Sequence, residues 1–175
     1  IGLIAAVREP ARFSALVMIG PSACYINDGD YVGGFERADI DGLIDSLEAN
    51  YLGWSRTLAP AIMGNPERPA LAGELTNSFC QADPEIAKQF ARVTFLSDHR
   101  AELPLLHLPA QILQCSDDVI APLSVGDYLQ EQLPGGELTI LTATGHCPPL
   151  NAPQETIEAT NGFLSRHALW QKPPI

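Results

Sequence analysis

Residues 109–150, PAQILQCSDDVIAPLSVGDYLQEQLPGGELTILTATGHCPPL, contain the pattern that decides the fold. Two short apolar runs, Ala110–Cys115 and Leu138–Leu141, lie on either side of a segment with a helical pattern, Pro122–Gln132. Short apolar runs of this kind are typical of strands that are buried on both faces of a parallel sheet. Two neighbouring parallel strands need a crossover connection, which a helix normally supplies. The stretch therefore predicts a strand, a helix and a second strand that runs parallel to the first.

A polar loop follows each of the two predicted strands. The first loop contains Asp118 and the second contains His146. In open α/β sheets, functional groups gather just beyond the carboxyl ends of the strands. An acid that precedes a histidine in the chain matches the order of the α/β-hydrolases, in which the acid orients the imidazole and the imidazole takes a proton from a serine. The alternative is an ordinary turn acid and a loop imidazole. Asp117 and Asp118 are alternative candidates for the acid that orients the imidazole, because the side chains of adjacent loop residues do not both point into one pocket.

The rest of the chain alternates between strand and helix around a long helical segment. The remaining predicted elements are a helix at 1–8, a strand at 15–19, four helices at 38–50, 51–63, 67–81 and 83–95, a last helix at 153–168 and a loose tail from 169. Alternating strands and helices predict an α/β domain with a parallel sheet. Three strands make a thin sheet, so we expect further strands from residues before Ile1.

The composition excludes several classes of protein. The chain has 175 residues, of which 46% are hydrophobic and 18% charged, as is usual for globular proteins. The formal net charge is −11 and the ten lysines and arginines are scattered, which argues against binding of nucleic acid. No apolar run approaches the roughly 18 residues of a membrane span. The four cysteines form no CxxC pair, so no metal site is expected, and a reducing cytoplasm is the simplest location.

Several further stretches together resemble one family. They are GPSACYIND (20–28), GGFE (33–36), NYLGW (50–54), FCQADPEIAKQFA (79–91), FLSDHR (95–100), SDDVIAP (116–122) and TGHCPPLNAP (144–153). The combination resembles the RsbQ family, which consists of bacterial α/β-hydrolase-like regulators of the general stress response and is related to the karrikin and strigolactone receptors of plants. The resemblance runs from Ile1 to about Ala168.

The resemblance implies an α/β-hydrolase fold with a four-helix, V-shaped lid over a small hydrophobic pocket. The core would comprise residues 1–34 and 98–175, and the lid residues 35–97. The family's spacing makes Asp118, four residues before a proline, the orienting acid, and His146, after a glycine, the base. By motif position, the residues expected to line the pocket are Phe35, Trp54, Phe95 and Ser97, with Ile120 and Cys147 beside the acid and the base. The alternative is that these large apolar residues belong to an ordinary core.

The nucleophile of the family is not found among these residues. No GxSxG pattern occurs, and Ser22 follows a proline with no helix after it, so we interpret it as a loop residue. The chain begins with Ile1 inside an apolar helical pattern, and the resemblance places the family's serine a few residues before it. The resemblance implies hydrolysis of a small hydrophobic ester or lactone and a PAS-domain phosphatase as signalling partner, without a cofactor. The alternatives are a metabolic esterase or lactonase and a ligand-binding module without catalysis.

Overall fold

A computed structural model of the protein describes residues 1–169, and nearly all of the tail predicted from residue 169 lies outside this range. The elements are, in chain order, α1 (Gly2–Arg8), η1 (Pro10–Arg12), β1 (Leu16–Ile19), α2 (Arg37–Ala49), α3 (Tyr51–Met63), α4 (Pro69–Gln81), α5 (Pro84–Leu96), η2 (Arg100–Leu105), β2 (Ala110–Asp117), α6 (Leu123–Gln132), β3 (Gly136–Thr144), α7 (Pro148–Asn151) and α8 (Pro153–Arg166). The predicted strands and long helices are therefore confirmed, whereas the short helices η1, η2 and α7 were not predicted.

The described strands form one parallel sheet in the order β1-β2-β3. Ala110, at the start of β2, pairs with Leu16 of β1 and with Gly136 of β3. Both β2 and β3 extend two or more residues beyond the predicted runs, because their pairing continues to Asp117 and Thr144, past the apolar residues that mark the buried part. The carboxyl ends of β2 and β3 consequently lie side by side.

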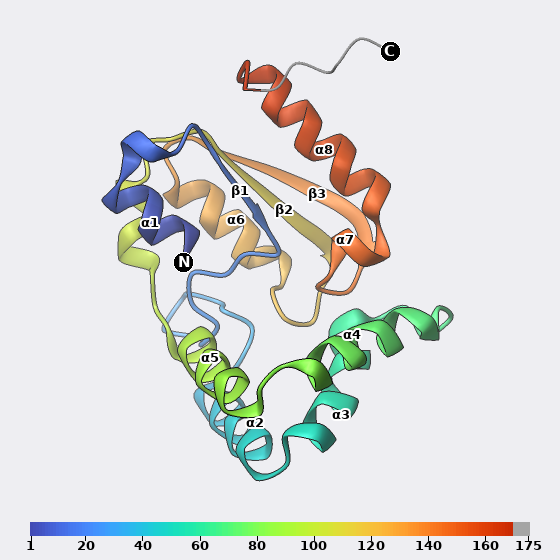
Figure 1. Cartoon of the computed structure of the whole chain (residues 1–175). Helices are drawn as coiled ribbons and strands as arrows, with labels where there is room; N and C mark the ends of the chain where they lie inside the picture. Colours follow the sequence, from blue (N-terminus) through green and yellow to red (C-terminus); the bar gives the residue numbers. More distant parts are fainter. Residues whose placement is uncertain (170–175) are drawn as a thin grey trace.

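Helices cover both faces of the sheet (Figure 1). On one face, α1 and α6 pack over Ile112 and its neighbours in a core that includes Leu129. On the other face, α7 and α8 lie over Leu113 and Leu141. Residues 112 and 113 are adjacent in β2 and fully buried on opposite faces, as expected for a central strand of a parallel sheet.

The four helices α2 to α5, here called the helical insertion (Arg37–Leu96), project from the carboxyl end of the sheet. In Figure 1 they form a V in which α2 lies against α5 and α3 lies against α4. Local signals explain where these helices begin: the Asn50 side chain accepts a hydrogen bond from Gly53 at the start of α3, and Asp83 accepts from two backbone N–H groups at the start of α5. Helix α4 begins at a proline, two residues later than predicted.

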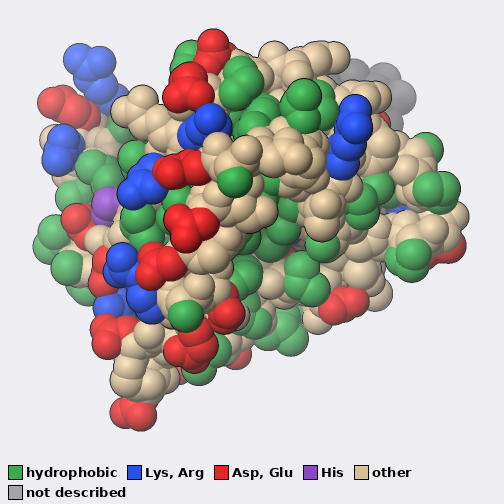
Figure 2. Space-filling model, turned by 90° about the horizontal axis from the view of Figure 1, so that it is seen from below, with side chains coloured by type: hydrophobic (Ala, Val, Ile, Leu, Met, Phe, Trp, Pro, Cys, Tyr) green, Lys and Arg blue, Asp and Glu red, His purple; other side chains and the backbone are tan. Residues whose placement is uncertain are grey.

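The surface seen from below in Figure 2 mixes acidic, basic and hydrophobic side chains. Three exposed apolar residues, Ile86, Phe90 and Val93, follow helical spacing along α5. Within residues 1–169, we find no helix with the length and apolar character needed to cross a membrane.

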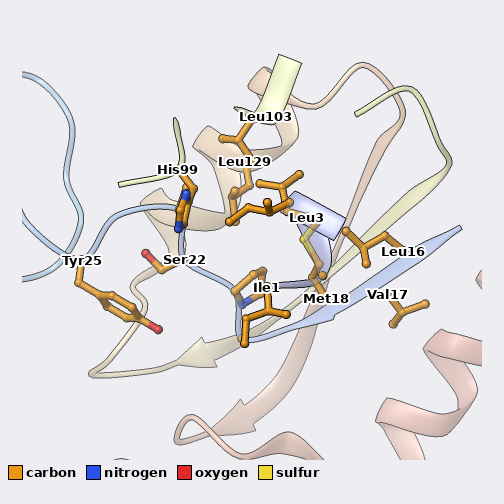
Figure 3. A pocket seen from close by; sticks show the side chains of 15 residues that line it. Ile1, Leu3, Leu16, Val17, Met18, Ser22, Tyr25, His99, Leu103 and Leu129 are labelled. Atoms are coloured by element: carbon orange, nitrogen blue, oxygen red, sulfur yellow. The ribbon is translucent and has the colours of Figure 1, made fainter. Parts of the chain in front are cut away.

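One edge of the sheet, along β1, is not paired within the described residues. A cavity of about 340 Å³ lies there, and Figure 3 shows it lined by Ile1, just before α1, and by Leu16 and Met18 of β1. Ser22 and His99 line its polar side. This edge therefore presents apolar side chains and unpaired strand backbone together.

The core predicts a stability difference between two leucines of the same helix. Leu129 of α6 is 1% exposed in the main core, whereas Leu123, at the start of that helix, is 41% exposed. We expect Leu129→Ala to lower the free energy of unfolding by about 2–5 kcal/mol, because it leaves a cavity, and Leu123→Ala to lower it by less than about 1 kcal/mol. Urea titration followed by circular dichroism measures both, and similar losses would contradict this packing.

Candidate active site

Asp118 and His146 meet at the carboxyl ends of β2 and β3. Nδ1 of His146 lies 2.8 Å from Oδ2 of Asp118. The side chain of Asp118 is fully buried, and that of His146 is 21% exposed. A carboxylate is a pure acceptor, so this contact places the ring proton on Nδ1. Nε2 has no hydrogen-bond partner among residues 1–169 and is available as a base.

The loop after β2 holds the buried carboxylate of Asp118 in place. Its second oxygen, Oδ1, accepts hydrogen bonds from the backbone N–H groups of Ile120, at 2.8 Å, and Ala121, at 3.2 Å. Gln114 of β2 is completely buried, and its amide donates to the carbonyl of Ala121 and lies 3.5 Å from Oδ2 of Asp118. A buried carboxylate is stable only when its oxygens are hydrogen-bonded, and here both are.

The neighbouring acid, Asp117, does not take part in this pair. It is the last residue of β2, is exposed, and contributes its backbone carbonyl to the N–H of Gly145 at 2.7 Å. That hydrogen bond joins the two loops one residue before His146. The structure thus brings Asp118, and not Asp117, to the imidazole.

The loop that carries His146 also contacts the helical insertion. The backbone N–H of His146 donates to the carbonyl of Ile62, in the last turn of α3, at 2.8 Å. Gly145 has φ +92°, and a Cβ at that position would lie 2.0 Å from the carbonyl oxygen of Met63. Only glycine combines this backbone conformation with so close an approach.

A second glycine lies beneath the imidazole, at the end of β1. Gly20 has φ +55°, and a Cβ there would lie 3.0 Å from Cε1 of His146. The ring of His146 therefore lies against the carboxylate of Asp118 and the end of β1, while its backbone is hydrogen-bonded to the last turn of α3.

A cavity of about 440 Å³ opens between this pair and the helical insertion. Most of its wall is hydrophobic or aromatic, and it includes Tyr25, Tyr51, Trp54, Leu58, Ile62, Phe79, Phe90, Phe95, Ile120 and His146. The hydroxyl of Tyr51 is hydrogen-bonded to the carbonyl of Phe79 at 2.6 Å and is not free for a ligand. An apolar pocket of this size with few polar groups suits a small uncharged ligand.

Of the residues predicted to line the pocket, Trp54, Phe95 and Ile120 border this cavity, whereas Phe35, Ser97 and Cys147 do not. Phe35 packs on Phe95 at 6.5 Å between ring centroids, in the core behind the wall. The hydroxyl of Ser97 turns back to the carbonyl of Thr94 at the end of α5. Cys147, which precedes α7, does not itself line the cavity but packs against a cluster that includes the lining residues Ile62 and Ile120.

The prediction missed Tyr25 and several aromatic and aliphatic side chains of α3 to α5 that do line the cavity. The ring of Tyr25 contacts Phe95 at 5.1 Å between centroids. Helical spacing marks such side chains as buried, but it does not distinguish a cavity wall from a core. The sequence therefore carried no signal that would have selected them.

Burial keeps the phenol of Tyr25 and the thiols of Cys115 and Cys147 in their neutral forms. It raises the pKa of Tyr25 to about 12, with a further contribution from the charge of Asp118. Burial, followed by Asp118, also raises the pKa of the Cys147 thiol and raises that of Cys115 to about 12. Neither cysteine thus becomes a thiolate nucleophile at neutral pH. The hydroxyl of Ser22 donates to the carbonyl of Cys24 at 2.8 Å and does not border the cavity at His146, which agrees with its interpretation as a loop residue.

Known proteins resemble this chain along almost its whole length. No protein-family model matches it. It is 38% identical over 168 residues to the strigolactone esterase D14 of Arabidopsis thaliana, covering 95% of this chain and 62% of that protein. It is 34% identical over 158 residues to the karrikin insensitive 2 receptor CA of Petunia hybrida, covering 90% of this chain and 58% of that receptor. The chain thus spans less than two thirds of the length of these relatives.

Among solved structures, a hydrolase from Oleispira antarctica superposes with a TM-score of 0.82 and 41% sequence identity, covering 91% of this chain and 60% of that one. Structures of further hydrolases and esterases that share 16–20% identity with the chain have the same fold. The three-stranded sheet and the helical insertion therefore correspond to part of a larger, known architecture.

Gly145 provides a test of the contact between the histidine loop and the helical insertion. We expect Gly145→Ala to lower the free energy of unfolding by more than about 2 kcal/mol, because an added Cβ strains the backbone and collides with Met63. Gly73 of α4 is the matched control, since an added Cβ there meets no atom within 4 Å. Gly73→Ala should leave stability unchanged or raise it by up to about 1 kcal/mol. Thermal unfolding compares the two variants, and equal effects would contradict the close approach.

Proposed function

We propose that this chain, which belongs to the α/β-hydrolase superfamily, contributes the acid, the base and the lid of a serine hydrolase that acts on a small hydrophobic ester or lactone. The observation that carries the proposal is the 2.8 Å contact between the buried Asp118 and Nδ1 of His146, with the same histidine bordering an apolar cavity. We assign residues 1–34 and 98–175 to the hydrolase core and residues 35–97 to the lid.

The nucleophile in this proposal is a serine supplied by residues outside the 175 of this chain. It would reach Nε2 of His146 from the free edge of β1, where Gly20 already lies against the imidazole. His146 takes the proton of the serine hydroxyl as the oxygen attacks the ester carbonyl, and it then returns the proton to the departing alcohol. A water molecule hydrolyses the acyl-enzyme by the same route. Asp118 accepts from Nδ1 throughout and keeps the ring in the required tautomer and orientation.

The biological role that we propose is signalling in the cytoplasm, in the manner of the RsbQ-like regulators. A ligand would be bound or hydrolysed under the helical insertion, and a partner protein, such as a PAS-domain phosphatase, would recognise the resulting state. The similarity to a karrikin receptor and to a strigolactone esterase supports a small apolar ligand. The similarity to a bacterial hydrolase fits an esterase or lactonase of metabolism equally well.

A second candidate function is binding of a ligand without hydrolysis. It is favoured by the cavity itself, whose wall comes from the helical insertion together with Tyr25, Ile120 and His146. Such a wall binds an apolar molecule whether or not a nucleophile is present.

Labelling with a fluorophosphonate probe separates the two functions, because this reagent modifies only an activated serine. We expect the full-length protein to be labelled and His146→Ala to reduce the rate of labelling by at least about a hundredfold. His107→Ala, at an exposed histidine that does not line the cavity, should leave the rate unchanged. Mass spectrometry of the intact protein measures the modification. An unlabelled wild-type protein would contradict the hydrolase proposal and leave ligand binding as the function.

The two adjacent aspartates provide a matched test of the acid. Asp118→Asn should lower kcat for ester hydrolysis by about a thousandfold or more, because an amide in place of the carboxylate favours the wrong imidazole tautomer. Asp117→Asn should retain kcat within about threefold, since its side chain is exposed and contributes only a backbone carbonyl. Steady-state turnover of p-nitrophenyl esters compares the variants. Losses of equal size would show that the acid has been assigned incorrectly.

A further inference from the structure

One free carbonyl group in the last turn of α3 is satisfied by the loop that carries His146, and the next one by Asn65, which follows the helix. The final carbonyls of a helix have no partner within it. Here the carbonyl of Ile62 accepts from the backbone N–H of His146 at 2.8 Å, and the carbonyl of Met63 accepts from the side-chain amide of Asn65 at 2.9 Å. The end of the helix and the histidine loop therefore complete each other's hydrogen bonding.

Asn65 extends this contact by a second hydrogen bond. Its Nδ2 also donates to the carbonyl of Thr144 at 2.8 Å, so that one amide group links the helical insertion to the residue two before His146. Asn65 has φ +54°, a left-handed conformation that asparagine tolerates better than most residues. The conformation turns the chain after α3 and directs the side chain towards the loop.

A neighbouring bridge fixes the other side of the same loop. Asn151 of α7 donates to the carbonyl of Thr144 at 2.5 Å, and Nη1 of Arg68 donates to the carbonyl of Asn151 at 2.8 Å. The carbonyl of Thr144 thus accepts one hydrogen bond from an amide of the helical insertion and one from an amide of the core. Both lone pairs of that oxygen are used, which restricts where the loop can move.

The same helix end borders the ligand cavity. Leu58 and Ile62 of α3 form part of the cavity wall, and the carbonyl of Ile62 holds the backbone of His146. A ligand that displaces α3 therefore displaces the acceptor of the N–H of His146, and any shift of the loop changes the wall that the ligand contacts. Such a dependence between two sites is reciprocal.

We propose that Asn65 is a positioning residue, which fixes His146 to the helical insertion and makes the placement of the imidazole depend on the position of α3. The inference rests on the proposed function in that it treats His146 as the base. Asn65 does not line the cavity and its side-chain amide is hydrogen-bonded to Met63 and Thr144, so it acts through Thr144 and the backbone of residue 146.

The test compares two asparagine substitutions within the helical insertion of the full-length protein. Asn65→Gly removes the amide and keeps the left-handed backbone without strain. Asn77→Gly, at an exposed position of α4, destabilises the insertion by helix propensity alone and is the control for a merely structural effect. Amide hydrogen exchange followed by NMR reports on the backbone N–H of His146, and the amide of Leu141 in the interior of β3 is the internal reference.

We expect Asn65→Gly to accelerate exchange at His146 about tenfold, which corresponds to the loss of one hydrogen bond, while Leu141 and the control variant stay at the wild-type rate. For ester turnover we expect kcat to fall about tenfold with KM within about twofold, because misplacement of the base affects chemistry more than binding. Asn65→Asp, which keeps the shape but places a carboxylate against two carbonyl oxygens, should show at least the same acceleration of exchange.

Two results would overturn the proposal. Exchange at His146 that stays at the wild-type rate in Asn65→Gly would show that Asn65 does not hold the loop. Accelerated exchange with unchanged kcat would show that the contact is structural only. A wild-type protein without ester turnover would instead refute the proposed function, and the exchange rates would still decide whether Asn65 fixes the histidine loop to α3.

Discussion

The parallel pairing of β2 with β3 is the constraint on which the candidate site depends. Parallel strands bring their carboxyl ends to one edge. The pairing keeps one register from Ala110 with Gly136 to Cys115 with Leu141, then shifts by one residue so that Asp117 pairs with Thr144 where the two strands end. Asp118 and His146 then face each other across the gap between the loops. A slip of β3 by one residue along its whole length would turn its side chains to the opposite faces of the sheet and displace His146 from Asp118. The buried side chains on both faces of β2 oppose such a slip.

Burial of the Asp118 carboxylate imposes a second requirement. An ionised carboxylate in an apolar interior is unstable unless its oxygens are hydrogen-bonded. The loop after β2 provides two backbone N–H groups for one oxygen, and the loop after β3 provides the imidazole of His146 for the other, while Gln114 closes the first loop through the carbonyl of Ala121. His146 therefore helps to stabilise the buried carboxylate of Asp118, because its hydrogen bond replaces one that water would otherwise provide.

Most of the fold could be predicted from the sequence, because buried strands and amphipathic helices have periodic patterns. The meeting of an acid with His146 could be predicted as well, since position after a strand fixes the edge at which a side chain lies, but the choice of Asp118 over Asp117 came from the family resemblance and not from position. The set of residues that line the cavity could not be predicted, because helical spacing identifies the buried face of a helix but not whether that face meets a cavity or other side chains. The rings of Phe35 and Phe95 are neighbours, yet only Phe95 borders the cavity. The hydrogen bond from His146 to Ile62 joins residues 84 positions apart and leaves no local signal.

The approach of Gly145 to Met63 has a consequence for engineering and for the divergence of related hydrolases. An inserted domain is usually regarded as a module that can be exchanged while the parent scaffold is kept. Here the scaffold's own histidine loop is shaped to fit the carboxyl end of α3, with no space even for a methyl group between them. A chimaera that receives a foreign insertion needs a helix that ends at the same point and presents a carbonyl at the position of Ile62. Exchanges that preserve the last turn of α3 should be tolerated far better than exchanges that replace residues 35–97 as a whole.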